Sequence, residues 1–193
     1  MISLGQFVPE LQRRLLQIDK TLASGIESSN VDYDNESEVR ALLVEMLVDN
    51  INVIEASYVD RNGMLRYIEP REYRNFENVD ISNQAHVVAM QNNPVPTFTS
   101  GFVAVEGYLA VLDSHPVYDD EDRFVGTVNL LIRPELLIAP LLEKATIPDS
   151  YELWVMQRDG MIIYDQDSVE MGKMLFSDPL YKDYANLLSL IHI

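Results

Sequence analysis

The sequence predicts an α+β fold in which a long N-terminal helix precedes an antiparallel sheet of five strands, and an incomplete second module follows. Three observations support this prediction. Apolar residues recur at helical spacing over residues 6–26. An Asn-Gly turn, Asn62 and Gly63, joins two β-rich runs. Three further β-rich runs fill residues 99–132 and are separated by short turns. Helices beside one antiparallel sheet are typical of the α+β class.

Two helices are expected before the sheet. In the first, residues 6–26, Pro9 falls in the opening turn, where its missing N–H costs little. The second covers residues 35–50 and begins at a capping residue, Asn35 or Ser37. Each helix has one apolar stripe, formed by Phe7, Leu11, Leu15, Ile18 and Leu22 in the first and by Val39, Leu42, Leu43, Met46 and Leu47 in the second.

A hairpin and a helical crossover are expected next. Residues 54–60 and 64–68 form the hairpin around the Asn-Gly turn. A polar loop follows, and Asp80 to Ser82 are expected to cap a short helix that runs through Gln91. Pro94 and Pro96 end that helix, because proline restricts the residue before it and lacks an N–H.

The rest of the sheet is expected in residues 99–106, 108–118 and 124–132. Gly107 forms the first turn between these strands, and the acidic residues 119–122 form the second. An apolar helix over residues 135–144 leads out of the module, and Pro140 bends it or ends it early.

Residues 155–164 resemble residues 58–67. The two segments share an arginine, a glycine, a methionine and a tyrosine at matching places, and each reads as a hairpin. Ser177 to Pro179 would then begin a helix as Asp80 does in the first copy. The second copy ends before its last three strands would fit. We therefore expect N-terminal helices in residues 1–53, a complete module in 54–145 and a partial second module in 146–193.

Composition excludes several functions. Fourteen basic and 31 acidic residues give a net charge of −17, which disfavours nucleic-acid and peripheral membrane binding. There is no cysteine, the three histidines lack metal-ligand spacing, and the acidic turn lacks the spacing of a calcium loop. The sequence has no G-x-S-x-G, no phosphate-binding loop and no H-E-x-x-H, and nothing in it places Ser, His and Asp together. We expect no enzyme activity, no metal and no cofactor. The sequence has no apolar run long enough to span a membrane and no signal peptide, so it reads as a cytoplasmic protein or as a piece of a larger one.

The motifs together resemble the double Cache family, the PAS-like extracytoplasmic sensor domains of histidine kinases and chemoreceptors. The resemblance rests on the order of a long first helix and five motifs: Tyr-Val-Asp-Arg-Asn-Gly at 58–63, Asp-Ile-Ser at 80–82, Pro-Val-Tyr-Asp at 116–119, Gly-Thr-Val-Asn-Leu-Leu-Ile at 126–132 and Trp-Val-Met-Gln-Arg-Asp-Gly at 154–160. The overall residue pattern of the sequence is similar to that of archaeal sensors. The resemblance implies two PAS-like modules, with a ligand pocket on the sheet of the first, membrane-distal one.

Two departures from the family pattern concern the ligand. Amino-acid-binding members carry Arg-x-Trp-Tyr after the Asp-x-x element, where this sequence has Gln-Ala-His-Val at 84–87. They also carry an aspartate in the last strand, where Leu131 stands here. These departures argue against a free amino acid as the ligand.

His86 and His115 are the leading candidates for ligand contact, because a helix and a strand could turn both toward one cavity. Asp113 shares a strand face with His115, and Ser100 shares one with Phe102. Each candidate also has an explanation without a ligand. His86 and His115 could be partly buried histidines, Ser82 and Asn83 could only cap a helix, and Phe98 and Phe102 could be core residues. The expected contacts of a small ligand, with a carboxylate as one expected class, are His86, His115, Ser100, Asp113, Ser82, Asn83, Phe98 and Tyr73.

The resemblance thus implies an extracytoplasmic sensor domain that is anchored to the membrane in its parent protein and signals through its terminal helices. Two alternatives remain open from the sequence. The chain could be a ligand-independent structural module, since the first helix would suit a parallel homodimer. It could also be a cytoplasmic PAS-type sensor.

Overall fold

The computed structural model describes residues 4–48, 50, 52–144 and 154–184. Two helices open the chain, α1 (Leu4–Ser28) and α2 (Glu36–Val48). The central module then contains β1 (Glu55–Asp60), β2 (Met64–Glu69), the 3-10 helix η1 (Arg71–Phe76), β3 (Val79–Asp80), α3 (Ala85–Asn92), β4 (Thr97–Phe98), β5 (Phe102–Val103), β6 (Leu109–Tyr118), β7 (Phe124–Ile132) and α4 (Pro134–Leu142). The C-terminal part contains β8 (Val155–Met156), β9 (Ile162–Tyr164) and the 3-10 helix η2 (Pro179–Tyr184).

The central sheet is antiparallel, with strand order β3-β2-β1-β7-β6-β4, and β5 also pairs with β6. This confirms the α+β fold with one antiparallel sheet. The predicted single strand over residues 99–106 is wrong in detail, because two short strands, β4 and β5, pair with different parts of β6. Between them, Gly101 donates its backbone N–H to the Gln157 side chain at 2.9 Å and not to β6.

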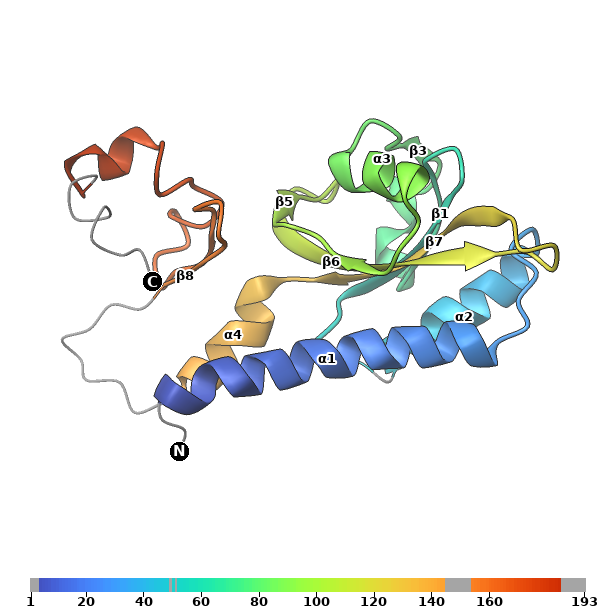
Figure 1. The fold of residues 1–193 in the computed structure, drawn as a ribbon, viewed down its shortest axis with the longest axis horizontal. Helices are drawn as coiled ribbons and strands as arrows, with labels where there is room; N and C mark the ends of the chain where they lie inside the picture. Colours follow the sequence, from blue (N-terminus) through green and yellow to red (C-terminus); the bar gives the residue numbers. More distant parts are fainter. Residues whose placement is uncertain (1–3, 49, 51, 145–153, 185–193) are drawn as a thin grey trace.

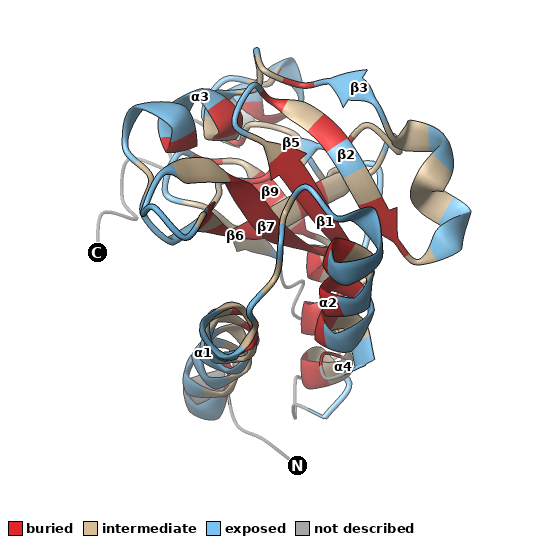
Figure 2. Cartoon of the chain, turned by 90° about the vertical axis from the view of Figure 1, so that its right-hand side faces the viewer, coloured by how far each residue is buried: buried red, intermediate tan, exposed pale blue. Residues whose placement is uncertain are grey.

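The helices cover both faces of the sheet. Figure 1 shows α1, α2 and α4 on one side and α3 on the other. The predicted apolar stripes are confirmed: Ile18 and Leu22 of α1 pack with Leu43 of α2 and with Val128 of β7 in one core. Buried residues run along the strands between the helices, as Figure 2 shows. The middle of the sheet is therefore buried on both faces.

Local chemistry fixes where the elements begin. Asn35 caps α2, since its Oδ1 accepts the N–H of Ser37 at 3.1 Å. The expected cap of α3 is wrong: Asp80 Oδ1 accepts the N–H of Ser82 in a local turn, and the helix begins later, after Gln84. α3 ends at Asn92, before Pro94, as predicted.

The hairpin turn between β1 and β2 also contacts the segment that leads into α3. Gly63 has φ +85°, a conformation that favours glycine. Asp60 Oδ1 accepts the N–H groups of Asn62 and Met64, which closes the turn. Gly63 in turn accepts the N–H of Ile81 at 2.9 Å, so the turn holds the segment that leads into α3.

The C-terminal part contains the predicted hairpin, β8–β9, with Gly160 at φ +92° in its turn. Asp178 Oδ1 accepts the N–H of Leu180 at the start of η2, where the repeat predicts a helix start. Tyr164 of β9 packs with Phe7 of α1 and with α4. Residues 146–153 and 185–193 of the expected third segment, and residue 145 at the end of the expected central module, lie outside the described residues. Among the described helices, none is long and apolar enough to span a membrane.

Candidate functional site

A cavity of about 690 Å³ lies between α3 and the strands β4 and β5. Ala85 and Ala89 on α3 contribute small side chains to its wall, which leaves room beneath the helix. The break between β4 and β5 adds Ser100 and Gly101 to the opposite wall. The rest of the lining comes from Gln84, His86, Met90, Asn93, Val95, Thr97, Phe98, Thr99, Phe102, Val103 and Ser114.

A second cavity, of about 40 Å³, adjoins the first at Gln84, His86 and Phe102, which line both. Its walls lie deeper on the sheet and include Glu55 and Ser57 of β1. A volume of this size suits a water molecule or one small ligand group. The two cavities together offer a larger outer chamber and a narrow inner one, with His86 between them.

His86 is half-buried, and its ring centroid lies 5.0 Å from that of Phe102. Burial lowers the pKa of His86 to about 4. The imidazole is therefore neutral at neutral pH and can donate one hydrogen bond and accept another. A charge-assisted bond from an imidazolium to a carboxylate ligand is not what this side chain offers.

The sheet beneath the cavities carries a buried polar group. Ser114 Oγ donates to Asn129 Oδ1 at 2.6 Å, and Asn129 Nδ2 donates to the backbone oxygens of Thr127 and Ser57. Ser114 lines the outer cavity and Asn129 the inner one. These partnered groups fix the floor of the site and leave the hydroxyl of Ser114 able to accept a ligand donor.

An acidic pair lies at the inner cavity. Glu55, which is 4% exposed, and Glu106 both line it. Glu55 Oε2 and Glu106 Oε1 are buried and accept no hydrogen bond. Burial raises the pKa of Glu55 to about 9, and the neighbouring charge of Glu106 is the second cause. No arginine or lysine of the described segments lines either cavity. The site therefore favours a ligand that brings hydrogen-bond donors or positive charge.

Three predicted contact residues, His86, Ser100 and Phe98, line the outer cavity. Ser82, Asn83 and Tyr73 do not. Ser82 lies against the Gly63 turn, Asn83 is exposed in the loop before α3, and Tyr73 packs against the cluster of Leu65, Ile68 and Val87.

Asp113 and His115 lie on the opposite face of the sheet. His115 Nε2 is 3.0 Å from Asp19 Oδ1 of α1 and 3.4 Å from Asp113 Oδ1. The expectation that His86 and His115 face one cavity is therefore wrong. Side chains alternate along β6, and it is Ser114 that points to the α3 side.

Sequence reasoning missed the acidic pair and the floor of the site. Glu55 opens β1 and is followed by the buried residues Ala56 to Val59, and a glutamate in a buried run is the one signal that marks it. Asn129 stands within the otherwise apolar run of β7 in the same way.

The family comparison agrees with this architecture. The model of the family described as "HK/GC/Chemotaxis protein-like, sensor domain" matches residues 14–134, which contain α2, the whole central sheet and α3. A search of curated protein sequences gives no match.

Several solved structures share the fold. An extracellular ligand binding receptor from Desulfohalobium retbaense superposes with a TM-score of 0.80 at 24% identity, over 94% of this chain and 33% of that one. The ligand binding domain of the Pseudomonas aeruginosa amino acid chemoreceptor PctC, in complex with GABA, gives 0.67 at 18% identity, over 89% and 77%. That of PctB from the same organism, with L-Arg, gives 0.64 at 13% identity, over 89% and 66%. The chain thus spans about a third of the first of these proteins.

The expected resemblance is confirmed in both fold and family. A sheet with helices on both faces and a cavity beneath the crossover helix accompanies a family match over more than half of the chain. The chain belongs to the HK/GC/chemotaxis protein-like sensor domains.

Proposed function

We propose that this sensor domain binds a small molecule in the cavity beneath α3 and is the extracytoplasmic part of a membrane receptor. The observation that carries the proposal is the 690 Å³ cavity between α3 and β4–β5, which is large enough for a metabolite and has polar groups at its floor. The structurally similar chemoreceptor domains in complex with GABA and L-Arg support a small-molecule ligand by analogy.

The ligand carries an amino group or other donors rather than relying on a carboxylate. The carboxylate expectation rested on a charged histidine together with backbone N–H groups, and His86 is neutral at neutral pH. Glu55 holds a proton at neutral pH, and its contact with Glu106 is among the causes of its raised pKa. An ammonium group reaching the inner cavity would take the place of that proton and bond both carboxyl groups. His86, Ser100 and Ser114 would bond the polar part of the ligand in the outer cavity.

Binding would change how α3 packs on the sheet and so act on the helices at the ends of the module. The cavity wall also touches the C-terminal hairpin, through the bond from Gly101 to Gln157. Met161 and Ile163 lie close to Gly101 as well. A ligand that moved the β4–β5 wall would therefore disturb the hairpin directly.

The organisation of the parent protein is part of the proposal. Residues 1–53 would supply helices, 54–145 the ligand-binding module and 146–193 part of a second module. The parent would be anchored in a membrane, with α1 as a candidate homodimer contact, since Val8 and Leu16 of α1 are exposed. The chain itself would have no catalytic role.

Thermal-shift screening followed by titration calorimetry tests the proposal. Equal panels of small amines, amino acids, polyols and carboxylates are compared on the 193-residue chain. We expect amino compounds to bind, and His86→Ala and Glu55→Gln to weaken the best of them by at least about tenfold, the loss of one good polar contact. Glu121→Gln, a change at an exposed turn, serves as the control.

The two halves of the proposal fail separately. Binding of carboxylates alone would reject the ligand class. Binding that neither His86→Ala nor Glu55→Gln weakens would reject the cavity as the site. If no compound of any class shifted the melting temperature, the ligand-independent module would be the better account.

A further inference from the structure

Three side chains from two distant segments converge between α1 and the sheet, on the face away from the ligand cavity. Asp113 and His115 project from β6, and Asp19 projects from α1. One oxygen of each carboxylate and one ring nitrogen of His115 all lie within 4.8 Å of one another. Among the described residues, this is the group with donor atoms placed to hold a metal ion.

The burial of Asp113 without a hydrogen-bond partner indicates that this group binds a ligand. It is 0% exposed, and neither of its carboxylate oxygens accepts a hydrogen bond. A buried carboxylate costs several kcal/mol unless it is paired or coordinates a metal. Its neighbour His115, at 3.4 Å, is shared with Asp19, which lies closer at 3.0 Å. The polar pairing within the group therefore leaves Asp113 under-satisfied.

We propose that Asp19, Asp113 and His115 form a binding site for a divalent transition metal, with Zn²⁺ as the favoured ion. His115 Nε2 hydrogen-bonds Asp19 at 3.0 Å and lies 3.4 Å from Asp113, and the three ligand atoms lie within 4.8 Å of one another. Ligands bound to zinc at about 2.0–2.1 Å in a tetrahedron lie roughly 3.3 Å apart, so an ion that replaced the proton of this hydrogen bond would need only small side-chain shifts. One imidazole with two carboxylates suits zinc better than calcium or magnesium, which prefer oxygen ligands alone.

An ion could reach this site from solvent, and its binding would link α1 to β6. The side chain of Asp19 is 36% exposed, whereas Asp113 closes the inner end, so an ion would enter along α1. Three protein ligands leave a fourth position for water or for a group of another molecule. A bound ion would fasten α1 to β6, at a point 96 residues apart in the chain. The packing of the first helix would then depend on metal as well as on the cavity.

Zinc titration of the 193-residue chain after dialysis against a chelator tests this site. Calorimetry measures affinity and stoichiometry, thermal shift measures stabilisation, and Co²⁺ absorption reports a tetrahedral site. We expect one tight Zn²⁺ per chain and a higher melting temperature with Zn²⁺. His115→Gln and Asp113→Asn should weaken binding by at least about tenfold, since loss of residues that only support metal ligands already costs ten- to a hundredfold.

The controls separate this site from the acidic surface and from the ligand cavity. His86→Gln, which alters a histidine on the other face, should leave Zn²⁺ binding unchanged. If Asp113→Asn does not fold, Asp19→Asn changes a partly exposed ligand and should show the same loss. The proposal is overturned if the wild type binds no Zn²⁺ more tightly than His115→Gln does, which would mean that exposed carboxylates alone hold the ion.

Discussion

Glu55 and Leu131 lie opposite each other in the antiparallel register of β1 and β7, and both line the inner cavity. The double Cache resemblance places an aspartate of amino-acid-binding members at Leu131. Opposite residues of an antiparallel pair have side chains on the same face, so Glu55 brings a carboxyl group to the same part of the pocket from the neighbouring strand.

We predict that Glu55→Gln stabilises the ligand-free protein in alkaline solution. The folded pKa of Glu55, about 9, is raised from its ordinary 4.5, so its contribution is fully present below pH 4.5 and is lost as the pH rises toward 9. Glutamine carries no charge to bury, and at pH 8 the variant should be more stable by about 2 kcal/mol. Urea unfolding at pH 5 and pH 8 measures this. An equal pH dependence in wild type and variant would contradict the buried, proton-holding Glu55.

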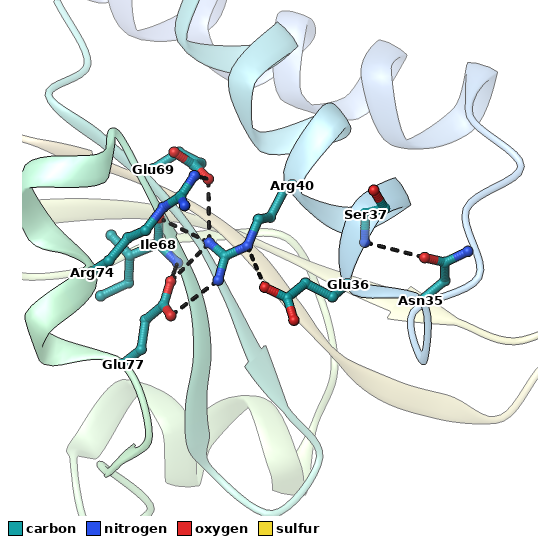
Figure 3. Close-up of polar contacts among 8 residues, drawn as sticks. All are labelled: Asn35, Glu36, Ser37, Arg40, Ile68, Glu69, Arg74 and Glu77. Atoms are coloured by element: carbon teal, nitrogen blue, oxygen red, sulfur yellow. Dashed lines mark hydrogen bonds and ion pairs between the residues drawn. The ribbon is translucent and has the colours of Figure 1, made fainter.

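The Arg40 cluster, shown in Figure 3, predicts a different pH response. Arg40 of α2 bonds Glu77 through two nitrogens and also contacts Glu69 of β2, so it ties the second helix to the sheet. Burial alone would raise the pKa of Glu77, but the hydrogen bonds from Arg40 and from the Ile68 N–H lower it below its ordinary value. The stability that Glu77 contributes is therefore present above pH 4.5 and is lost as the pH falls through the folded pKa.

We predict that Arg40→Met lowers the free energy of unfolding by about 2–3 kcal/mol at pH 7, because it leaves the partly buried Glu77 without the guanidinium that bonds both its oxygens, whereas Glu69 keeps its contact with Arg74. The variant should also lose less stability than wild type between pH 5 and pH 3. Arg123→Met, which breaks an exposed pair with Asp119, is the matched control and should cost less than about 1 kcal/mol. Equal losses in the two variants would show that the Arg40 cluster is no stronger than a surface ion pair.

Alanine substitutions at Gly63 and Gly107 make a second matched comparison. Both have positive φ, +85° and +90°, but a Cβ at Gly63 would lie 2.5 Å from the Cα of Ser82, whereas one at Gly107 meets nothing within 4 Å. We predict that Gly107→Ala costs about 1 kcal/mol, from backbone strain alone. Gly63→Ala should cost more than about 2 kcal/mol, since the crossover before α3 must also shift. Denaturant midpoints of the two variants measure the difference, and similar midpoints would argue against the close approach of the crossover.

Local patterns in the sequence were sufficient for most of the fold. The helical stripes of α1 and α2, the Asn-Gly hairpin and the two long strands β6 and β7 follow from spacing and turn residues, which act over a few positions. The break between β4 and β5 could not be predicted from local patterns. Gly101, which lies in the break, donates its N–H to Gln157, which is 56 residues further along the chain.

The site was harder to predict because β6 is buried on both faces. Alternation places Asp113 with His115 and Ser114 with Leu112, but it does not say which pair lies under α3 and which under α1. The Asp19–His115 contact could not be predicted because the two residues are 96 positions apart in the sequence. The single glutamate in β1 does not indicate that it lies beside Glu106. Chemistry that arises between segments far apart in sequence is set by packing, which spacing alone does not specify.

Hydrogen exchange of the chain with and without its best-binding amino compound locates the bound ligand, because it reports which backbone segments the ligand protects. At 100 times its dissociation constant the compound should stabilise the domain by about 2.7 kcal/mol. We expect the strongest added protection in peptides from residues 84–103, which contain α3, β4 and β5. Protection confined to α1 and α2, with residues 84–103 unchanged, would contradict the cavity beneath α3 as the sensing site.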